Sequence, residues 1–396
     1  MPPLAVTAHT ATSAAGRGVA ALSAALRERR SGLRRNDFTR TALECWIGRV
    51  DGLEQAPLPA GYASLDCRNN RLAWAGLTQD GFLEQALAAV QRYGAGRVAI
   101  VLGTSTASIG ATEEGYRELA DDGVFLPAYR DFVLHTPHSL VTFVQRVLGA
   151  RGPACTVATA CSSSAKVFAQ AERLIRLGWA DAAVVGGVDT LCDSVLFGFN
   201  ALQLVSPQPC RPFDAGRNGI SIGEAAGFAL LERGGNAAGA AQLLGWGESS
   251  DAHHMSSPHP QGRGARQAIA GALQRAGLDA ADIGYINLHG TATPANDAVE
   301  AAVVADLFPA QTRASSTKGW TGHTLGAAGI VEAVACLIAL EQGFIPGTLN
   351  CSEPDPLCGP QLALDNEAAA PQVALSSSFG FGGNNAALIF GRGGRA

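Results

Sequence analysis

The chain has 396 residues, of which 47% are hydrophobic and 16% are charged, and its formal net charge is −5. This composition is typical of an ordered globular protein with enough length for two core-bearing units. The weak negative charge gives no reason to expect a nucleic-acid partner. We expect no membrane span, because no run of about 18 apolar residues occurs, and the N-terminus lacks the pattern of a secretory signal.

Apolar, strand-like runs alternate with helical periods along the chain. The predicted strands cover residues 98–102, 182–185, 227–231, 285–288 and 386–390. The predicted helices cover residues 18–29, 81–93, 140–148, 165–177, 266–276, 298–307 and 327–342. This alternation predicts a layered α/β fold in which most strands are buried.

A weak internal repeat divides the chain. Residues 223–233 and 382–392 each begin with a glycine-marked turn, continue as an apolar strand and end in arginine. A small-residue linker at 233–241 lies between the two. We therefore predict two halves, 1–240 and 241–396, that share one interface and are not independent domains.

Cys161 follows an apolar run and precedes a predicted helix, in the sequence Thr-Ala-Cys-Ser-Ser-Ser. Unpaired backbone N–H groups and the positive end of the helix dipole at such a turn favour the thiolate, the reactive form of cysteine. The nine cysteines show no disulfide framework and no CxxC pairs, so we expect no structural zinc. Reduced thiols fit a cytoplasmic protein.

Two later segments carry partners for a nucleophilic cysteine. His289 lies in His-Gly-Thr-Ala-Thr, and Lys318 and His323 lie in Lys-Gly-Trp-Thr-Gly-His. The chain has 27 arginines and only two lysines, Lys166 and Lys318. A compact ammonium kept at Lys318 suggests a specific role there, whereas we expect Lys166 to be structural. One cysteine, two histidines and a lysine indicate acyl transfer through a thioester.

Taken together, these motifs resemble those of the β-ketoacyl-acyl-carrier-protein synthases, the decarboxylating condensing enzymes of fatty acid and polyketide synthesis. The resemblance covers about residues 5–392. It rests on the ordered motifs at 159–164, 211–214, 223–227, 251–255, 289–297, 318–329 and 378–385. It implies the thiolase fold, a duplicated αβαβα layered unit, and usually a dimer.

The resemblance also implies residue roles. Cys161 would be the nucleophile, and the backbone amides of Cys161 and Phe381 would stabilise the oxyanion. His289 and His323 would stabilise the enolate that forms when a malonyl group loses CO2. Lys318 would order the two histidines, with Glu300 as its carboxylate partner.

Further residues are expected to bind substrate. Thr291 and Thr293 match the hydroxyls that bind the pantetheine arm, and Phe381, close to Phe379, matches the mobile gate that admits the malonyl unit. We expect Thr106 to line the acyl pocket. An unpaired hydroxyl there would disfavour a saturated tail, which favours an unsaturated, aromatic or otherwise specialised acyl chain. The segments 135–140 and 161–164 also resemble discrete, polyene-type synthases of secondary metabolism.

The expected reaction is acyl transfer to Cys161, then decarboxylative Claisen condensation with malonyl carrier protein to give a β-ketoacyl chain two carbons longer. The alternative is the active subunit of a heterodimer with a non-catalytic partner that resembles a chain-length factor. A homodimer is the default. The expected further partner is acyl carrier protein. No metal or organic cofactor is implied, since the phosphopantetheine arm arrives with the substrate.

Other functions are disfavoured. A thiolase would need a second cysteine within residues 379–385, which contain none. The condensing enzymes primed by coenzyme A use a Cys-His-Asn set, which the Lys318 and His323 segment does not match. A non-catalytic chain-length subunit would lack the nucleophile, whereas this chain has it.

Overall fold

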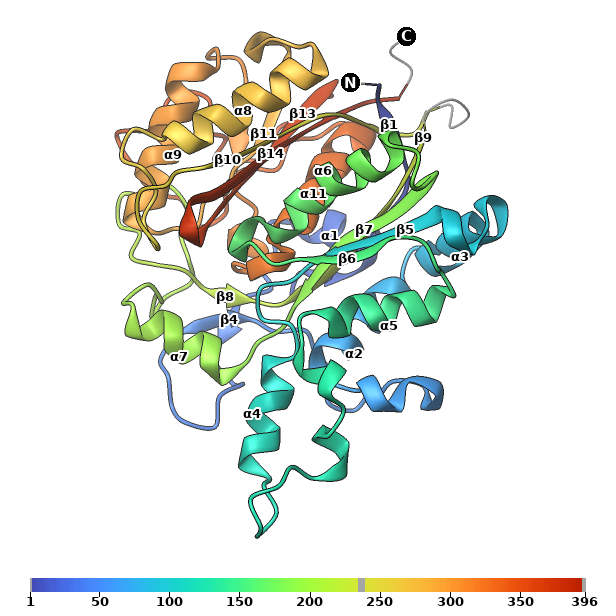
Figure 1. The fold of residues 1–396 in the computed structure, drawn as a ribbon. Coiled ribbons are helices and arrows are strands. Elements are labelled where there is room, and N and C mark those ends of the chain that lie inside the picture. Colours follow the sequence, from blue (N-terminus) through green and yellow to red (C-terminus); the bar gives the residue numbers. More distant parts are fainter. Residues whose placement is uncertain (1, 234–238, 394–396) are drawn as a thin grey trace.

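The computed structural model describes residues 2–233 and 239–393, and Figure 1 shows their helices and strands. The strands are β1 (Leu4–Ser13), β2 (Gly16–Arg17), β3 (Arg34–Arg35), β4 (Trp46–Gly48), β5 (Val98–Gly103), β6 (Ala154–Val157), β7 (Ala182–Asp189), β8 (Ile222–Gly223), β9 (Ala225–Arg233), β10 (Gln242–Ser250), β11 (Tyr285–Asn287), β12 (Arg313–Ser315), β13 (Val373–Gly380) and β14 (Asn384–Gly391). The helices are α1 (Gly18–Arg27), α2 (Arg68–Leu77), α3 (Phe82–Tyr93), α4 (Ile109–Arg117), α5 (His138–Leu148), α6 (Ser163–Arg176), α7 (Asp193–Ala201), α8 (Arg263–Ala276), α9 (Pro294–Leu307), α10 (Lys318–Thr321) and α11 (Ala328–Gln342). Every predicted strand and helix is present, with ends that differ by a few residues.

The main sheet contains the same five-strand pattern twice. In the first half the order is β6-β5-β7-β9-β1, and in the second half it is β12-β11-β13-β14-β10. In each set the first three strands run parallel and the last two pair antiparallel with their neighbours. A short pairing of β1 with β10 joins the sets. The strands that carry the weak sequence repeat, β9 and β14, occupy the same place in the two sets, so the predicted duplication is confirmed.

Helices form three layers around these strands. Helices α6 and α11 lie between the two five-strand sets (Figure 1), and their apolar side chains share one core with residues of both sets. Helices α2, α3 and α5 cover the outer face of the first set, and α8 and α9 cover the outer face of the second. This is the αβαβα arrangement that the sequence predicts.

The innermost helix is also the most apolar. Within the described ranges, one helical stretch, Leu325–Gln342, is long and apolar enough to cross a membrane by composition alone, with a mean hydropathy of 1.6. It is, however, 89% buried inside the fold, as α11 between the two strand sets. Its composition therefore reflects a buried core position.

The division at residue 240 stays a prediction. The two proposed halves meet in one continuous sheet through β1 and β10. Part of the expected linker, residues 234–238, lies outside the described residues.

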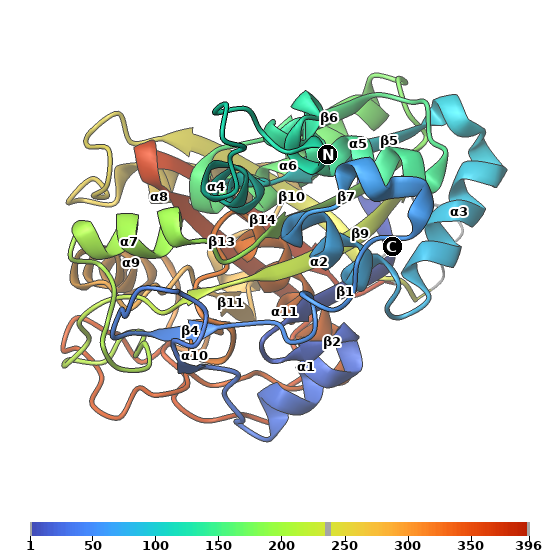
Figure 2. The same cartoon turned by 90° about the horizontal axis from the view of Figure 1, so that it is seen from below.

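A helical arm projects from the first half. It comprises residues 109–135, begins with α4, and extends away from the sheets (Figure 1). Seen from below, α4 is viewed end-on (Figure 2). The arm leads back through α5 to β6, which has only one neighbour in the sheet, and Thr156 of β6 donates a hydrogen bond to the Pro137 carbonyl oxygen at 3.2 Å. The residues that directly follow the arm therefore lie against β6, at the open edge of the sheet.

Candidate active site

Cys161 lies at the turn where β6 leads into α6. Ala160 has a φ of 51°, which is uncommon for a residue with a side chain, and the helical turn Ala160–Ser162 places Cys161 just before α6. The Cys161 side chain is buried, with 5% of its residue surface exposed. The predicted position at a strand-to-helix turn is confirmed.

Two histidines from the second half lie beside this thiol. His323 Nε2 is 2.9 Å from Cys161 Sγ. The rings of His289 and His323 are 5.4 Å apart at 87°. The backbone N–H of Phe381 donates to the Cys161 sulfur. The fold thus brings together four groups that the sequence places in four distant segments.

Lys318 is buried behind the histidines. Its ammonium contacts the carboxylate of Glu332 in α11 and the carbonyl oxygen of His289, and its Nζ is 3.4 Å from His289 Nδ1. Lys318 and Glu332 are each 2% exposed, so neither charge is solvated by bulk water. A buried pair of this kind needs both partners, since a single unpaired charge would be strongly destabilising.

The prediction that Glu300 pairs with Lys318 is therefore wrong. Glu300 accepts hydrogen bonds from the backbone N–H groups of His289 and Gly290, both at 2.8 Å, and from Ser377 Oγ at 2.7 Å. The physical reason is that α9 directs Glu300 onto the backbone of the His289 turn. Glu300 holds the turn, whereas Glu332 balances the lysine.

Burial controls the protonation of the site. It raises the pKa of the Cys161 thiol to about 11, while the Lys318 ammonium and the Phe381 N–H act in the opposite direction. Burial, followed by the charge of Lys318, lowers the pKa of both His289 and His323 well below the ordinary histidine value. The resting site therefore holds a protonated thiol and two neutral imidazoles. The expected preference for thiolate is outweighed by desolvation.

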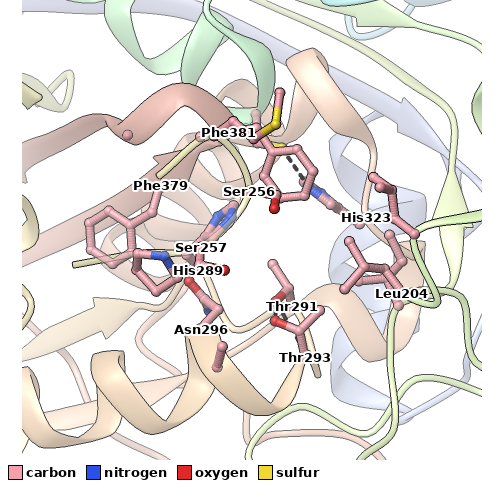
Figure 3. Close-up of a pocket in the computed structure, with 18 of the residues that line it drawn as sticks. Leu204, Ser256, Ser257, His289, Thr291, Thr293, Asn296, His323, Phe379 and Phe381 are labelled. Atoms are coloured by element: carbon pink, nitrogen blue, oxygen red, sulfur yellow. Dashed lines mark hydrogen bonds between the residues drawn. The ribbon is translucent and has the colours of Figure 1, made fainter. Parts of the chain in front are cut away.

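These groups open into a cavity of about 350 Å³. Figure 3 shows the rings of Phe379 and Phe381 on one side of it and Thr291 and Thr293 on the other. The two threonine hydroxyls are 2.9 Å apart. Four of the five predicted substrate-binding residues, all except Thr106, line the cavity. Apolar side chains that include Phe199, Leu202, Leu204 and Met255 line it as well.

Comparison with known proteins agrees with this geometry. Residues 69–237 match the family model "Beta-ketoacyl synthase, N-terminal domain", and residues 240–352 match "Beta-ketoacyl synthase, C-terminal domain". Nodulation protein E of Rhizobium meliloti (strain 1021) is 38% identical over 308 residues, which cover 74% of this chain and 75% of that protein. The 3-oxoacyl-[acyl-carrier-protein] synthase 2 of Staphylococcus aureus is 32% identical over 312 residues, which cover 75% of this chain and 77% of the other. The chain belongs to the β-ketoacyl synthase family.

Solved structures of other ketosynthases resemble this chain over nearly its whole length. A ketosynthase (ApeO) in complex with its chain length factor (ApeC) from Xenorhabdus doucetiae gives a TM-score of 0.88 at 36% identity, covering 99% of this chain and 98% of that one. The ishigamide ketosynthase/chain length factor gives a TM-score of 0.87 at 29% identity and covers 99% and 100%. The protein is thus a condensing acyltransferase with the thiolase fold.

Thr106 does not line the cavity of this synthase. Its hydroxyl lies 2.8 Å from Asp189 Oδ1 and donates a hydrogen bond to it. The expectation of an acyl-pocket hydroxyl is therefore wrong, because the end of β7 supplies a carboxylate that satisfies it. Because this hydroxyl is paired, it gives no reason to expect an unsaturated or aromatic acyl chain.

Two contributors to the synthase site were missed in the sequence. Glu332 is the one acidic residue in the apolar segment 327–340, and a carboxylate in a buried helix needs a charged partner, so this signal was present. Phe199 packs on Phe381 with ring centroids 5.6 Å apart, and no local pattern in the sequence marks that contact.

Proposed function

We propose that this synthase is the active condensing subunit of a discrete ketosynthase, and that Cys161 carries the growing acyl chain. The observation that carries the proposal is that Cys161, His289, His323 and the Phe381 amide lie together and line one cavity. In the first step Cys161 sulfur attacks the thioester carbonyl of an acyl carrier protein. The carbon–sulfur bond to pantetheine breaks, and the leaving thiolate takes up the thiol proton, with His323 Nε2 positioned to relay it.

The backbone N–H groups of Cys161 and Phe381 stabilise the oxyanion of each tetrahedral intermediate. One such donor is typically worth about 3 kcal/mol of transition-state stabilisation. The donation from the Phe381 N–H to the Cys161 sulfur places that amide beside the carbon that is attacked.

The second step needs two imidazole N–H donors. Lys318 Nζ, at 3.4 Å from His289 Nδ1, favours the tautomer in which Nδ1 accepts and Nε2 carries the proton. When the malonyl carbon–carbon bond breaks and CO2 leaves, His289 and His323 stabilise the enolate oxygen. The enolate carbon then attacks the acyl carbonyl on Cys161, and the cysteine thiolate leaves as the β-ketoacyl product forms.

The pantetheine arm of the carrier enters past Thr291 and Thr293, whose paired hydroxyls line the mouth of the cavity. Phe381 acts as the gate. Its ring rests on Phe199, and the Gly382 N–H donates to the Met255 carbonyl at 2.7 Å. Opening the gate would break these two contacts, which makes them the structural basis of the closed state.

We propose that the synthase works as a dimer, with a second copy or with a homologous chain-length factor. Two of the most similar solved structures are ketosynthase/chain length factor complexes. The arm exposes Ile109, Tyr116, Leu119, Val124, Leu126 and Phe132. Exposed apolar side chains and an unpaired sheet edge are each typical of an interface.

The pathway proposal is a specialised, polyene- or polyketide-type synthesis. It is supported by the 36% identity with the ketosynthase ApeO over nearly the full length of both chains. We further propose that the protein acts in the cytoplasm, where its nine unpaired cysteines would stay reduced.

The test is intact mass spectrometry after incubation with a panel of acyl-carrier thioesters and then malonyl-carrier. Acylation that is confined to Cys161, followed by release of a chain two carbons longer, is the expected result, and the preferred acyl group would identify the pathway. Loading and elongation by Cys161→Ala would contradict the proposal. Loading only after addition of a homologous partner would support the heterodimer over the homodimer.

A further inference from the structure

Asp189 is a buried carboxylate that takes no part in the proposed reaction steps. It is the last residue of β7 and is 0% exposed. Among the described residues, its hydrogen-bond partners are all uncharged hydroxyl and backbone N–H donors. An ionised carboxylate at such a depth needs this many donors because no water solvates it.

The donors come from two separate segments. Residues 104–106, which follow β5, provide Thr104 Oγ1 at 2.6 Å, Ser105 Oγ at 2.6 Å and the Thr106 N–H at 3.0 Å. The second segment provides the Gly326 N–H, 2.6 Å from Asp189 Oδ2. Asp189 therefore joins the loop after β5 to the turn that precedes α11.

That turn carries His323. The backbone of His323 is held on one side by β8 and the residue before it. The His323 N–H donates to the Ser221 carbonyl at 2.7 Å, and the Gly223 N–H donates to the His323 carbonyl at 2.9 Å. On the other side, Leu325 has a φ of 55°, an uncommon value for a β-carbon-bearing residue. The Gly326 N–H then reaches Asp189. The carboxylate is thus the second anchor of the turn, three residues after the catalytic imidazole.

The fit at Gly326 is close. A β-carbon added there would lie 2.6 Å from Asp189 Oδ2 and 2.6 Å from the Ser105 nitrogen. An alanine at this position would push the turn away from the carboxylate while leaving the negative charge in place. The charge and the anchoring can therefore be changed separately.

We propose that Asp189 is a positioning residue that fixes the turn 323–326, so that His323 Nε2 stays within hydrogen-bonding distance of Cys161 Sγ. The inference rests on the proposed function for the catalytic use of that pair. The same carboxylate holds residues 104–106 at the base of the helical arm, so the arm and the His323 turn share one anchor.

The charge of Asp189 and its anchoring of His323 affect two different measurable rates, the alkylation of Cys161 and the condensation reaction. The Cys161 thiol has its pKa raised mainly by burial, and the negative charge of Asp189 adds to this rise. Removing the charge should therefore make the thiol easier to ionise and to alkylate with iodoacetamide. Losing the position of His323 should instead slow condensation.

The experiment compares Asp189→Asn with Gly326→Ala. Asp189→Asn should alkylate faster at Cys161 than the wild type at pH 8 but condense about 100-fold more slowly, the size of effect that a misplacement near 1 Å produces. Gly326→Ala should lose kcat to a similar extent with an unchanged alkylation rate. The KM for malonyl-carrier should stay unchanged in both variants, because Asp189 does not touch the substrate cavity. The concentration of active sites is first determined from the amount of Cys161 that the acyl carrier acylates, and each rate is divided by it.

The matched control is Asp181→Asn, next to the opposite end of β7, where Asp181 pairs with Arg97 outside the site. It should leave both rates unchanged. Ser105→Ala removes one donor only and serves as a milder variant if the others fold poorly; it should lower kcat less than Asp189→Asn.

Wild-type kcat per active site in folded Asp189→Asn, Gly326→Ala or Ser105→Ala would overturn the inference, as would a loss that merely follows the unfolded fraction. The wild-type protein separates the two hypotheses. A wild type that neither loads nor condenses, alone or with a homologous partner, contradicts the proposed function and the inference with it. A condensing wild type with unimpaired variants contradicts the inference alone.

Discussion

Cys161 is poised as a thiol at rest, because the desolvation that protects it also disfavours its charge. The nearby ammonium of Lys318 and the Phe381 N–H offset part of this effect. We expect the proposed nucleophile to become active only when the carrier thioester arrives and His323 takes part in the proton transfer.

The pH dependence of Cys161 alkylation tests this state. Since the pKa is raised to about 11, the thiolate is a small fraction at neutral pH. The rate with iodoacetamide should rise about tenfold per pH unit from pH 7 to pH 10. Removing the Lys318 cation in the paired variant Lys318→Met with Glu332→Gln, which leaves no buried charge unpaired, should shift the profile to still higher pH. A rate that levels off below pH 8 would instead indicate a thiolate–imidazolium pair.

The same residues could bind a metal ion. The ligand atoms of Cys161, His289 and His323 all lie within 4.8 Å of one another, and a thiolate with two imidazoles is a common zinc ligand set. We propose that the enzyme acts without a metal. Added Zn²⁺ at micromolar concentration should then block acylation of Cys161, whereas dialysis against EDTA should leave the rate unchanged. A loss of activity on EDTA treatment that zinc restores would contradict this proposal.

The wrong predictions for Glu300 and Thr106 show which features of the site cannot be predicted from local sequence motifs. Cys161, His289, His323 and Lys318 lie in local motifs whose residue types already define the chemistry. The partner of Lys318 is instead decided by which helix faces the lysine, and α11 brings Glu332 to it whereas α9 directs Glu300 elsewhere. Thr106 likewise depends on Asp189, a residue 83 positions away. Local motifs predict the chemical groups, and tertiary packing decides their pairing.

At the scale of elements, the site depends on the close contact of α6 with α11. A β-carbon added to Gly329 of α11 would lie 2.5 Å from the Ala165 backbone nitrogen of α6. Since Cys161 precedes α6 and Glu332 lies on α11, this contact sets the distance between nucleophile and ion pair. The hydrophobic period predicted α6 and α11, although it missed other elements such as β1, β10, β13 and α2. It did not predict that α6 and α11 meet at backbone distance.

Gly329→Ala should therefore lower the free energy of unfolding by about 1–3 kcal/mol, the usual cost of overpacking. The matched control is Gly198→Ala in α7, where an added β-carbon would meet no atom within 4 Å. That variant should gain about 0.5–1 kcal/mol from helix propensity. Denaturant titration of both variants measures the difference, and equal stability of the two would show that α6 and α11 can separate at no cost.

At the scale of the whole molecule, two features stay exposed to solvent: the unpaired edge of β6 and the apolar side chains of the arm. The strand sets cover each other through α6 and α11, and helices cover their outer faces, but the described part of the chain has no element on the free side of β6. The arm also exposes apolar side chains to solvent. An assembly of two chains would cover both.

Phe132→Ser should weaken this assembly, because Phe132 is 76% exposed and apolar. The dissociation constant should rise about tenfold or more, as for an aromatic residue central to an interface. Sedimentation velocity over a range of concentrations measures it. Trp179→Ser is the control, since Trp179 is 63% exposed but lies after α6, outside the arm. An equal effect of both substitutions, or of neither, would place the interface elsewhere.

The two lysines have a practical consequence for such measurements. Lys318 is buried against Glu332, and the half-buried Lys166 donates to Asn384 Oδ1 at 3.3 Å. The chain therefore presents almost no free side-chain amine to solvent. Reagents that couple through amines, including common cross-linkers, biotin esters and sensor-chip chemistry, should label this protein poorly. Any complex with a carrier or partner is better captured through carboxylates or an affinity tag.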